Sequence, residues 1–384
     1  MKNLIFAISI ALLFTNCSSI GKGTPERVWA SRADSSSRSL MTHFWNVTHH
    51  YFNEASGADN WGNHYWPQAH ALDVLVDAYL RSGDDFYKAY FAQWLEGVHR
   101  ANGNKWANNY IDDMEWIGLA TLRAYHATGN EGFLTACKDV WNGTVDDMED
   151  RNAAFGIKKA WTDVGDGGIF WESRRNRHSK NACSNGPAAI LAAHLYQAFG
   201  DKEDLEWAKR IYAWEKQTLF NPETGAVSDN LNTERGTTNN RTYTYNQGTF
   251  IGAAVELYKM TGEKTYIEDA ITAADYTINS MINANDSLLR REGSGDGGLF
   301  KGIFIRYFTQ LIMSDGIGND VRNRYIAFLK HNAETLWFEG ANKEKVLFGP
   351  YWKTPPEDNT GHTEHLSGCM LIEAMALLGK KGFL

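Results

Sequence analysis

The chain has 384 residues and a formal net charge of −8, and it contains no cluster of lysine and arginine. A nucleic-acid surface needs a basic patch, so this composition excludes nucleic acid as a partner and fits a neutral ligand better. Apart from a short serine run at 35–39, no Pro-rich, Ser-rich or low-complexity linker divides the chain, which predicts one domain. Aromatic residues make up 13% of the chain, and many of the 14 tryptophans lie in polar segments, where they suit stacking on sugar rings.

The first 16 residues have the pattern of an export signal, because Lys2 precedes an apolar segment over 4–14 that is too short for a stable membrane span. Cys17 follows and resembles the lipidated cysteine of a bacterial lipoprotein, although Phe14 and Asn16 depart from the usual residues there. We expect a signal peptide over 1–16, a tether over 17–36 and one domain over 37–384. The expected location is the bacterial cell envelope, with the chain lipid-anchored to the outer membrane on its periplasmic or surface face.

A helix–glycine–helix pattern recurs at Gly83, Gly129, Gly200 and Gly262. Each glycine suits a left-handed helix end, and the following Asp, Asn or Glu suits the start of the next helix. The helix before each glycine is apolar on most faces, which predicts an inner helix, and the helix after it is amphipathic, which predicts an outer one. The expected inner helices lie near 69–81, 112–127, 185–199, 246–260, 301–313 and 364–378, and the outer ones near 37–50, 84–100, 131–150, 202–219, 264–284 and 319–338.

Six such pairs close a ring, so the predicted fold class is all-α, an (α/α)6 toroid of six helical hairpins. The inner-to-outer turns are short, whereas the outer-to-inner loops at 151–184, 220–245, 285–300 and 339–363 are long. Long loops gathered on one rim usually carry function. The rim at which the inner helices begin is therefore the expected site.

Two adjacent acids, Asp112 and Asp113, lie in the first turn of the second inner helix. Cleavage of a glycosidic bond needs two carboxyl groups, one as proton donor and one as base or nucleophile, and this pair supplies both. The alternative is a structural role, with Asp112 as the helix N-cap and Asp113 as an acid favoured by the helix dipole.

Other polar and aromatic residues are expected on the same rim. Tyr245, Asn246 and Gln247 open an inner helix and are predicted sugar contacts, as are Lys301, Trp66 and Trp171. The acidic run at 146–150 is better explained as a solvated helix end than as a calcium site. His362 and His365 lack a third ligand at a suitable spacing, so no metal and no cofactor are predicted.

The segments YIDDMEWIGLA, SKNACSNGPAAILAAHLY, YTYNQGTFIGAAVELYKMTG and FKGIFIRYF resemble bacterial members of glycoside hydrolase family 76. The resemblance implies an (α/α)6 toroid and a retaining endo-α-1,6-mannanase acting on α-mannan polysaccharide or oligosaccharides. It implies Asp112 as nucleophile, Asp113 as acid/base, and Asp229 in GAVSDNLN as a further substrate-binding acid. The segment VGDGGIFWE departs from the family pattern, in which relatives tend to show Cys or Asn before a GGG-like turn.

Three alternatives remain at this stage. A sugar epimerase on the same toroid would need a histidine pair, for which His70 and His126 are the candidates in inner helices. A glycan-binding lipoprotein without catalysis would use the aromatic rim but not the acids. An α-mannan transglycosylase would share the covalent intermediate and differ only in the acceptor, sugar instead of water.

Overall fold

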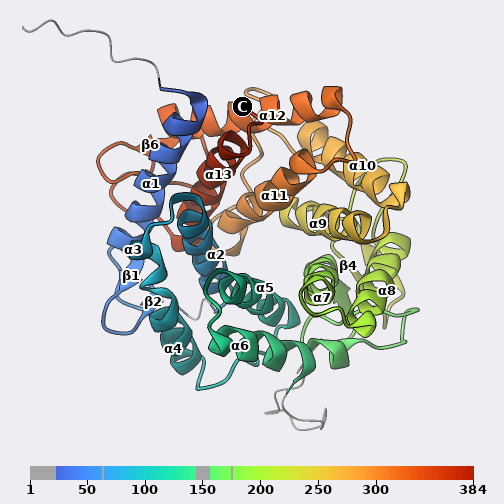
Figure 1. The fold of residues 1–384 in the computed structure, drawn as a ribbon. Helices are drawn as coiled ribbons and strands as arrows, with labels where there is room; N and C mark the ends of the chain where they lie inside the picture. The colour runs from blue at the N-terminus through green and yellow to red at the C-terminus, as the bar shows by residue number, and fades with distance from the viewer. Residues whose placement is uncertain (1–22, 63–64, 144–155, 174–175) are drawn as a thin grey trace, which may run out of the picture.

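The computed structural model describes residues 23–62, 65–143, 156–173 and 176–384, and its helices form two concentric rings (Figure 1). The inner ring consists of α2 (Tyr65–Ser82), α5 (Ile111–Thr128), α7 (Gly186–Phe199), α9 (Thr244–Thr261), α11 (Asp296–Met313) and α13 (His362–Lys380). The outer ring consists of α1 (Pro25–Phe44), α3 (Asp85–Lys88) with α4 (Phe91–Ala101), α6 (Glu131–Asn142), α8 (Lys202–Thr218), α10 (Lys264–Ser280) and α12 (Asn319–Thr335). The predicted (α/α)6 toroid is confirmed.

The two rings differ in burial as the sequence pattern predicts. The inner helix α9 is buried from Asn246 through Leu257 without a break, because neighbours cover it on nearly every side. The outer helix α8 buries one stripe that includes Ala208 and Ile211 and exposes its charged face. Each inner helix therefore belongs to the central core, and each outer helix screens it from solvent.

Short turns join inner to outer helices at one end of the toroid. Gly129, Gly200 and Gly262 end α5, α7 and α9 with φ of 69°, 75° and 72°, in the left-handed region that glycine adopts without strain. The next helix is capped at once, since Asn130 accepts from the Gly132 amide at 2.9 Å and Asp201 from the Glu203 amide at 3.0 Å. This geometry sends α5, α7 and α9 back outward within a few residues.

The N-terminal part of the domain differs from the prediction. Helix α1 begins at Pro25, so the tether predicted over 17–36 is wrong from residue 25 onward, and the outer helix predicted near 37–50 begins earlier. Trp29 and Ala33 are buried, and the Ser36 hydroxyl donates to the Ala33 carbonyl at 3.0 Å. The serine run that resembled a linker thus belongs to a packed helix whose hydroxyl groups are satisfied.

Other predicted features lie partly outside the described ranges. The signal peptide over 1–16, Cys17 and the acidic run at 146–150 all fall among residues that the structure does not describe. The outer helix predicted near 84–100 is divided into α3 and α4. Among the described residues, no helix combines the length and the apolar character that crossing a membrane requires.

The long loops gather at the end where the inner helices begin, and short strands join some of them. β3 (Ser179–Asn181), β4 (Asn230–Asn232) and β5 (Thr237–Asn239) form an antiparallel sheet that connects the loop before α7 to the loop before α9. β1 (Trp45–Asn46) pairs with β2 (Tyr51–Phe52), and β6 (Ala341–Asn342) with β7 (Leu347–Phe348). Three short helical turns, η1 (Ile157–Ala160), η2 (Ala182–Ser184) and η3 (Leu336–Gly340), complete the loops. These cross-links hold the rim loops in place.

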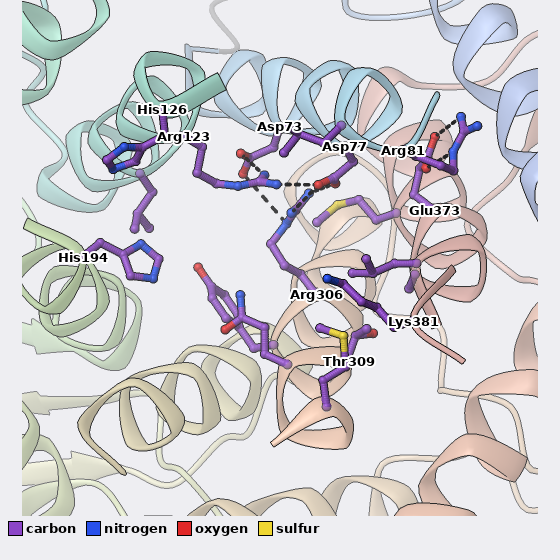
Figure 2. A pocket seen from close by; sticks show the side chains of 18 of the residues that line it. Asp73, Asp77, Arg81, Arg123, His126, His194, Arg306, Thr309, Glu373 and Lys381 are labelled. Carbon is purple, nitrogen blue, oxygen red and sulfur yellow. Dashed lines mark hydrogen bonds and ion pairs between the residues drawn. The ribbon is translucent and has the colours of Figure 1, made fainter. Parts of the chain in front are cut away.

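The opposite end of the toroid contains a cavity of about 580 Å³, lined by the C-terminal halves of α2, α5, α7, α11 and α13 (Figure 2). Arg123 pairs there with Asp73 and Asp77, and Arg306 donates to Asp77 at 2.7 Å. Arg123 lies 11 residues after Asp112 on α5, a rise of roughly 16 Å along the helix axis. This charged cavity and the rim carboxylates are therefore separate features of the molecule.

Candidate active site

Asp112 and Asp113 lie in the first turn of α5, on the rim that carries the long loops. The N-cap of α5 is Tyr110, whose side chain makes no capping bond, so neither aspartate fills the structural role of N-cap. Both side chains are half-buried, and Oδ1 of Asp112 is buried without a hydrogen-bond partner among the described residues. A buried carboxylate oxygen with no partner is costly, which is typical of a group held for chemistry.

The surroundings shift the pKa values of the two carboxyl groups by unequal amounts. Burial raises the pKa of Asp112 to about 6, against the effect of hydrogen bonds from the side chains of Cys183 and Trp171. Burial raises the pKa of Asp113 well above its usual range, and the negative charges of Asp112 and Asp296 raise it further. Burial therefore disfavours the ionised form of both carboxyl groups, and the neighbouring negative charges add to this effect at Asp113.

The side chains around Asp112 come from three separate rim segments. Cys183 lies in η2, is 1% exposed, and has its thiol within hydrogen-bonding reach of the Asp112 carboxyl and the Tyr245 hydroxyl. Trp171 reaches the same carboxyl from the loop before β3, and its ring packs against Tyr110 with centroids 5.1 Å apart. Asp112 thus lies near polar side chains from separate rim segments that favour its ionised form.

Cys183 is the site residue that the sequence analysis missed, because a widely spaced cysteine reads as a small buried hydrophobe. Its position immediately before an inner helix, on the functional rim, was the available signal. The amide of the preceding Ala182 donates to the Asp229 carbonyl at 2.9 Å, which fixes η2 against the loop before α9.

Asp229 and Asn246 are brought to the same place. The Asn246 amide lies 3.5 Å from Oδ1 of Asp229, and the Asn239 amide donates to Oδ2 at 3.0 Å. Burial raises the pKa of Asp229, and its charge reaches Cys183 and Tyr245. Asp229 thus acts on the two residues next to Asp112, whereas Asn246 contacts Asp229 but is fully buried, so its predicted sugar contact is wrong.

Trp66 contacts Asp296, the other acid whose charge acts on Asp113. Its indole donates to Oδ1 of Asp296 at 3.0 Å, a bond that joins the starts of α2 and α11. Its ring packs against His70 and Trp116, at centroid distances of 5.4 Å and 6.5 Å. Trp66 and Trp171 are both partly exposed, Trp66 in contact with Asp296 near Asp113 and Trp171 near Asp112.

Two further predicted sugar contacts are wrong. Gln247 is fully buried, and its amide bonds to the backbone of Gly225, Val227 and Ala273. Lys301 is 1% exposed, and its ammonium donates to the Pro350 carbonyl at 2.8 Å and lies 4.2 Å from the centre of the Trp352 ring. Both side chains bind the backbone of rim loops and are not exposed to a ligand. The prediction failed because sequence position alone does not reveal which way a side chain points.

The chain contains two further aspartate pairs, of which the structure describes one. Asp84 and Asp85 start α3 at the opposite end, where Asp84 accepts from the Phe86 amide at 2.9 Å and pairs with Arg38 at 2.8 Å. Asp146 and Asp147 lie outside the described residues. Among the described residues, only Asp112 and Asp113 combine adjacency, burial and a position on the functional rim.

The histidine pair that an epimerase would need is not assembled. His70 is buried between the rings of Trp66 and Trp116, and burial lowers its pKa well below the usual range. His126 lines the cavity at the other end of the toroid. The imidazole rings of His70 and His126 lie in different parts of the toroid, so they do not form an acid/base pair.

Known proteins share this architecture and much of this sequence. Residues 28–384 match glycosyl hydrolase family 76. An α-1,6-mannanase of Salegentibacter sp. is 40% identical and superposes with a TM-score of 0.83 over 91% of this chain and 99% of that one. An inactive variant of it, with two consecutive aspartates replaced by alanine, has been solved with α-1,6-mannotetrose and superposes with a TM-score of 0.84.

Two more distant relatives agree with this assignment. The Lin0763 protein of Listeria innocua is 30% identical, with a TM-score of 0.81 over 92% of this chain and 98% of that one. The mannan endo-1,6-alpha-mannosidase DCW1 of Eremothecium gossypii is 24% identical over 282 residues, or 68% of this chain and 57% of that protein. The chain thus matches little more than half the length of this curated relative. The toroid, the rim carboxylates and the match over residues 28–384 together establish that this chain belongs to glycosyl hydrolase family 76.

Proposed function

We propose that this protein is a retaining endo-α-1,6-mannanase that cleaves the backbone of α-mannan. The observation that carries the proposal is the pair Asp112 and Asp113, adjacent on the rim and held with unequal pKa values. The related Salegentibacter enzyme is an α-1,6-mannanase, and its inactive form lacks two consecutive aspartates. Among the residues that the structure describes, Asp112 and Asp113 are the adjacent aspartates suited to the same catalytic role in this chain.

In the first step the ionised Asp112 attacks the anomeric carbon of a mannose unit, while Asp113 gives its proton to the departing glycosidic oxygen. The side chains of Cys183 and Trp171 favour the ionised form of Asp112. In the second step Asp113, now ionised, takes a proton from water as that water attacks the anomeric carbon and releases Asp112.

The test is product analysis on unbranched α-1,6-mannan. The wild-type protein is expected to release a series of manno-oligosaccharides, and the variant Asp112→Asn/Asp113→Asn is expected to release none. Products longer than a supplied manno-oligosaccharide would instead indicate transglycosylation. Mannan binding without any product from the wild-type protein would contradict the proposal and favour a glycan-binding protein.

We further propose that the protein is exported and lipid-anchored at Cys17 in the outer membrane, on the basis of the N-terminal sequence pattern. The described chain starts at the end of the toroid opposite the rim, where Glu26 packs against Gly379 near the end of α13. An anchor there would hold the rim away from the membrane, toward a polymeric substrate. Radiolabelled palmitate is expected to label the wild-type protein but not Cys17→Ala, and labelling of both would refute the assignment.

A further inference from the structure

An unusual concentration of arginine lies on the rim beside the site. Here the loop before α9 and the loop before α11 enclose a polar depression of about 430 Å³, whose lining includes Arg241, Tyr243, Arg290, Arg291 and Glu292. The chain as a whole carries a net charge of −8, and yet three guanidinium groups and one carboxylate meet at this point. An excess of positive charge on an acidic protein needs a physical account.

One of the three arginines is a structural tie. Arg290 donates to the Thr242 carbonyl at 2.6 Å and lies 3.6 Å from Oε1 of Glu292. Glu292 in turn accepts from the amide of Thr244 at 3.0 Å and from its hydroxyl, which caps the start of α9. These bonds join the two loops into one rigid platform. The charges of Arg290 and Glu292 are paired with each other.

Arg241 and Arg291, the other two arginines of the depression, are not tied in this way. Within the described ranges, neither guanidinium has a carboxylate at ion-pair distance, and both residues are exposed. Arg241 is held in place by its own neighbour, because its guanidinium lies 4.9 Å from the centre of the Tyr243 ring. Tyr243 packs on Phe300 and Tyr245 with centroids 5.4 Å and 6.0 Å apart, so this arginine stands on a rigid aromatic support.

The platform is continuous with the catalytic cluster. Tyr245 reaches Cys183, which reaches Asp112. The positive charge of Arg241 acts to lower the pKa of Asp229, and that of Arg291 acts to lower the pKa of Lys301. Arg241 thus connects the depression to Asp229, and Arg291 lines the same depression as Arg241.

We propose that Arg241 and Arg291 form a subsite for an anionic ester group, phosphate or sulfate, carried by the mannan substrate. The inference rests on the proposed mannanase function and deepens it. A guanidinium presents a planar fork of donors that matches a tetrahedral oxyanion, whereas a neutral hydroxyl group gives it no charge to pair with. The tyrosine support keeps Arg241 ordered before substrate arrives, which lowers the entropy cost of binding.

The experiment compares kcat/KM on three substrates: neutral α-1,6-mannan and the same mannan carrying phosphate or sulfate esters. The wild-type protein is expected to prefer at least one anionic form, and the form preferred identifies the ester. The variant Arg241→Gln/Arg291→Gln is expected to lose about tenfold of that preference for each arginine removed, and raising the ionic strength is expected to weaken it in the wild-type protein. The matched control is Arg235→Gln, an exposed arginine of the same loop that does not line the depression, and it should keep the wild-type preference.

A second readout separates this proposal from the mannanase assignment. The variant Asp112→Asn/Asp113→Asn is used to measure Kd for the same three glycans, with and without the two arginine substitutions. Tighter binding of an anionic glycan that disappears with the arginines supports the subsite even if no mannan is cleaved. Equal kcat/KM and equal Kd for neutral and anionic mannan in the wild-type background would overturn it and leave these arginines as solvated surface.

Discussion

Asp112→Asn is expected to lower kcat on α-1,6-mannan by about 10⁴-fold or more, because an amide cannot attack the anomeric carbon. The helix start should persist, since the N-cap of α5 is Tyr110 and its capping does not use the Asp112 side chain. Steady-state kinetics together with circular dichroism would measure both effects. Asp84→Asn is the matched control: it alters an adjacent aspartate pair at the far end, keeps a residue suited to capping, and should retain full activity.

Asp113→Asn is expected to lose about 10²- to 10⁴-fold on mannan, the range typical of a missing general acid. The loss should be much smaller on a mannoside with a good leaving group, because that group departs without protonation. The same difference is not expected of Asp112→Asn, which lacks the nucleophile for every substrate. Equal losses for both variants on both substrates would contradict the assignment of the two roles.

The pH profile follows from the same pair. The active form has Asp112 ionised and Asp113 protonated, so activity should fall as the pH drops through about 6 and Asp112 takes up a proton. It should fall again on the alkaline side, as Asp113 loses the proton that burial and the charges of Asp112 and Asp296 help it retain. The two limits belong to the interacting pair, and the alkaline limit should disappear in Asp113→Asn.

The second large effect is on stability, at the opposite end of the toroid. Arg123→Met is expected to lower the free energy of unfolding by about 3 kcal/mol, because it leaves Asp73 and Asp77 with one cationic partner in place of two. Burial alone would raise the pKa of Asp77, and the charges of Arg123 and Arg306 hold it below its usual range. The melting temperature should fall by roughly 4 °C, since a domain of this size unfolds with a large entropy change.

A surface pair provides the control for this measurement. Arg324 pairs with Asp275 at 2.7 Å, but the two side chains are 48% and 34% exposed. Arg324→Met should therefore cost less than about 1 kcal/mol. If urea unfolding gives the same loss for Arg123→Met and Arg324→Met, the buried network is no stronger than an exposed ion pair. Folded Arg123→Met should retain its activity, because the network lies about three helical turns from Asp112.

The hairpin order was predictable because its signals are local. A glycine that ends a helix and a cap that starts the next lie within a few residues of each other, as at Gly129 and Asn130. The start of α1 was not predictable, because a run of serines has low helix propensity. Ser37 is tolerated there because its hydroxyl donates to Glu373, a residue from the far end of the chain, at 2.8 Å.

The direction of individual rim side chains was also not predictable. Asn246 and Gln247 are neighbours at the start of α9, yet Asn246 lies beside Asp229 while Gln247 binds three backbone groups below the rim. A rotation of about 100° per residue separates them on the helix, and which direction faces substrate depends on the packing of α9 against its neighbours.

The sequence by itself determined the alternation of inner and outer helices, the rim on which the long loops gather, and the two aspartates in the first turn of α5. Helix ends and amphipathic faces arise from residues close in the chain, so their pattern is visible without a structure. Only the tertiary structure decided how strongly burial and neighbouring charges act on each carboxyl group, which cysteine and tryptophan lie near Asp112, and which arginines of the described rim have no ion-pair partner. Those properties come from burial and from charges such as Asp296 acting on Asp113, which depend on distances between residues far apart in the chain.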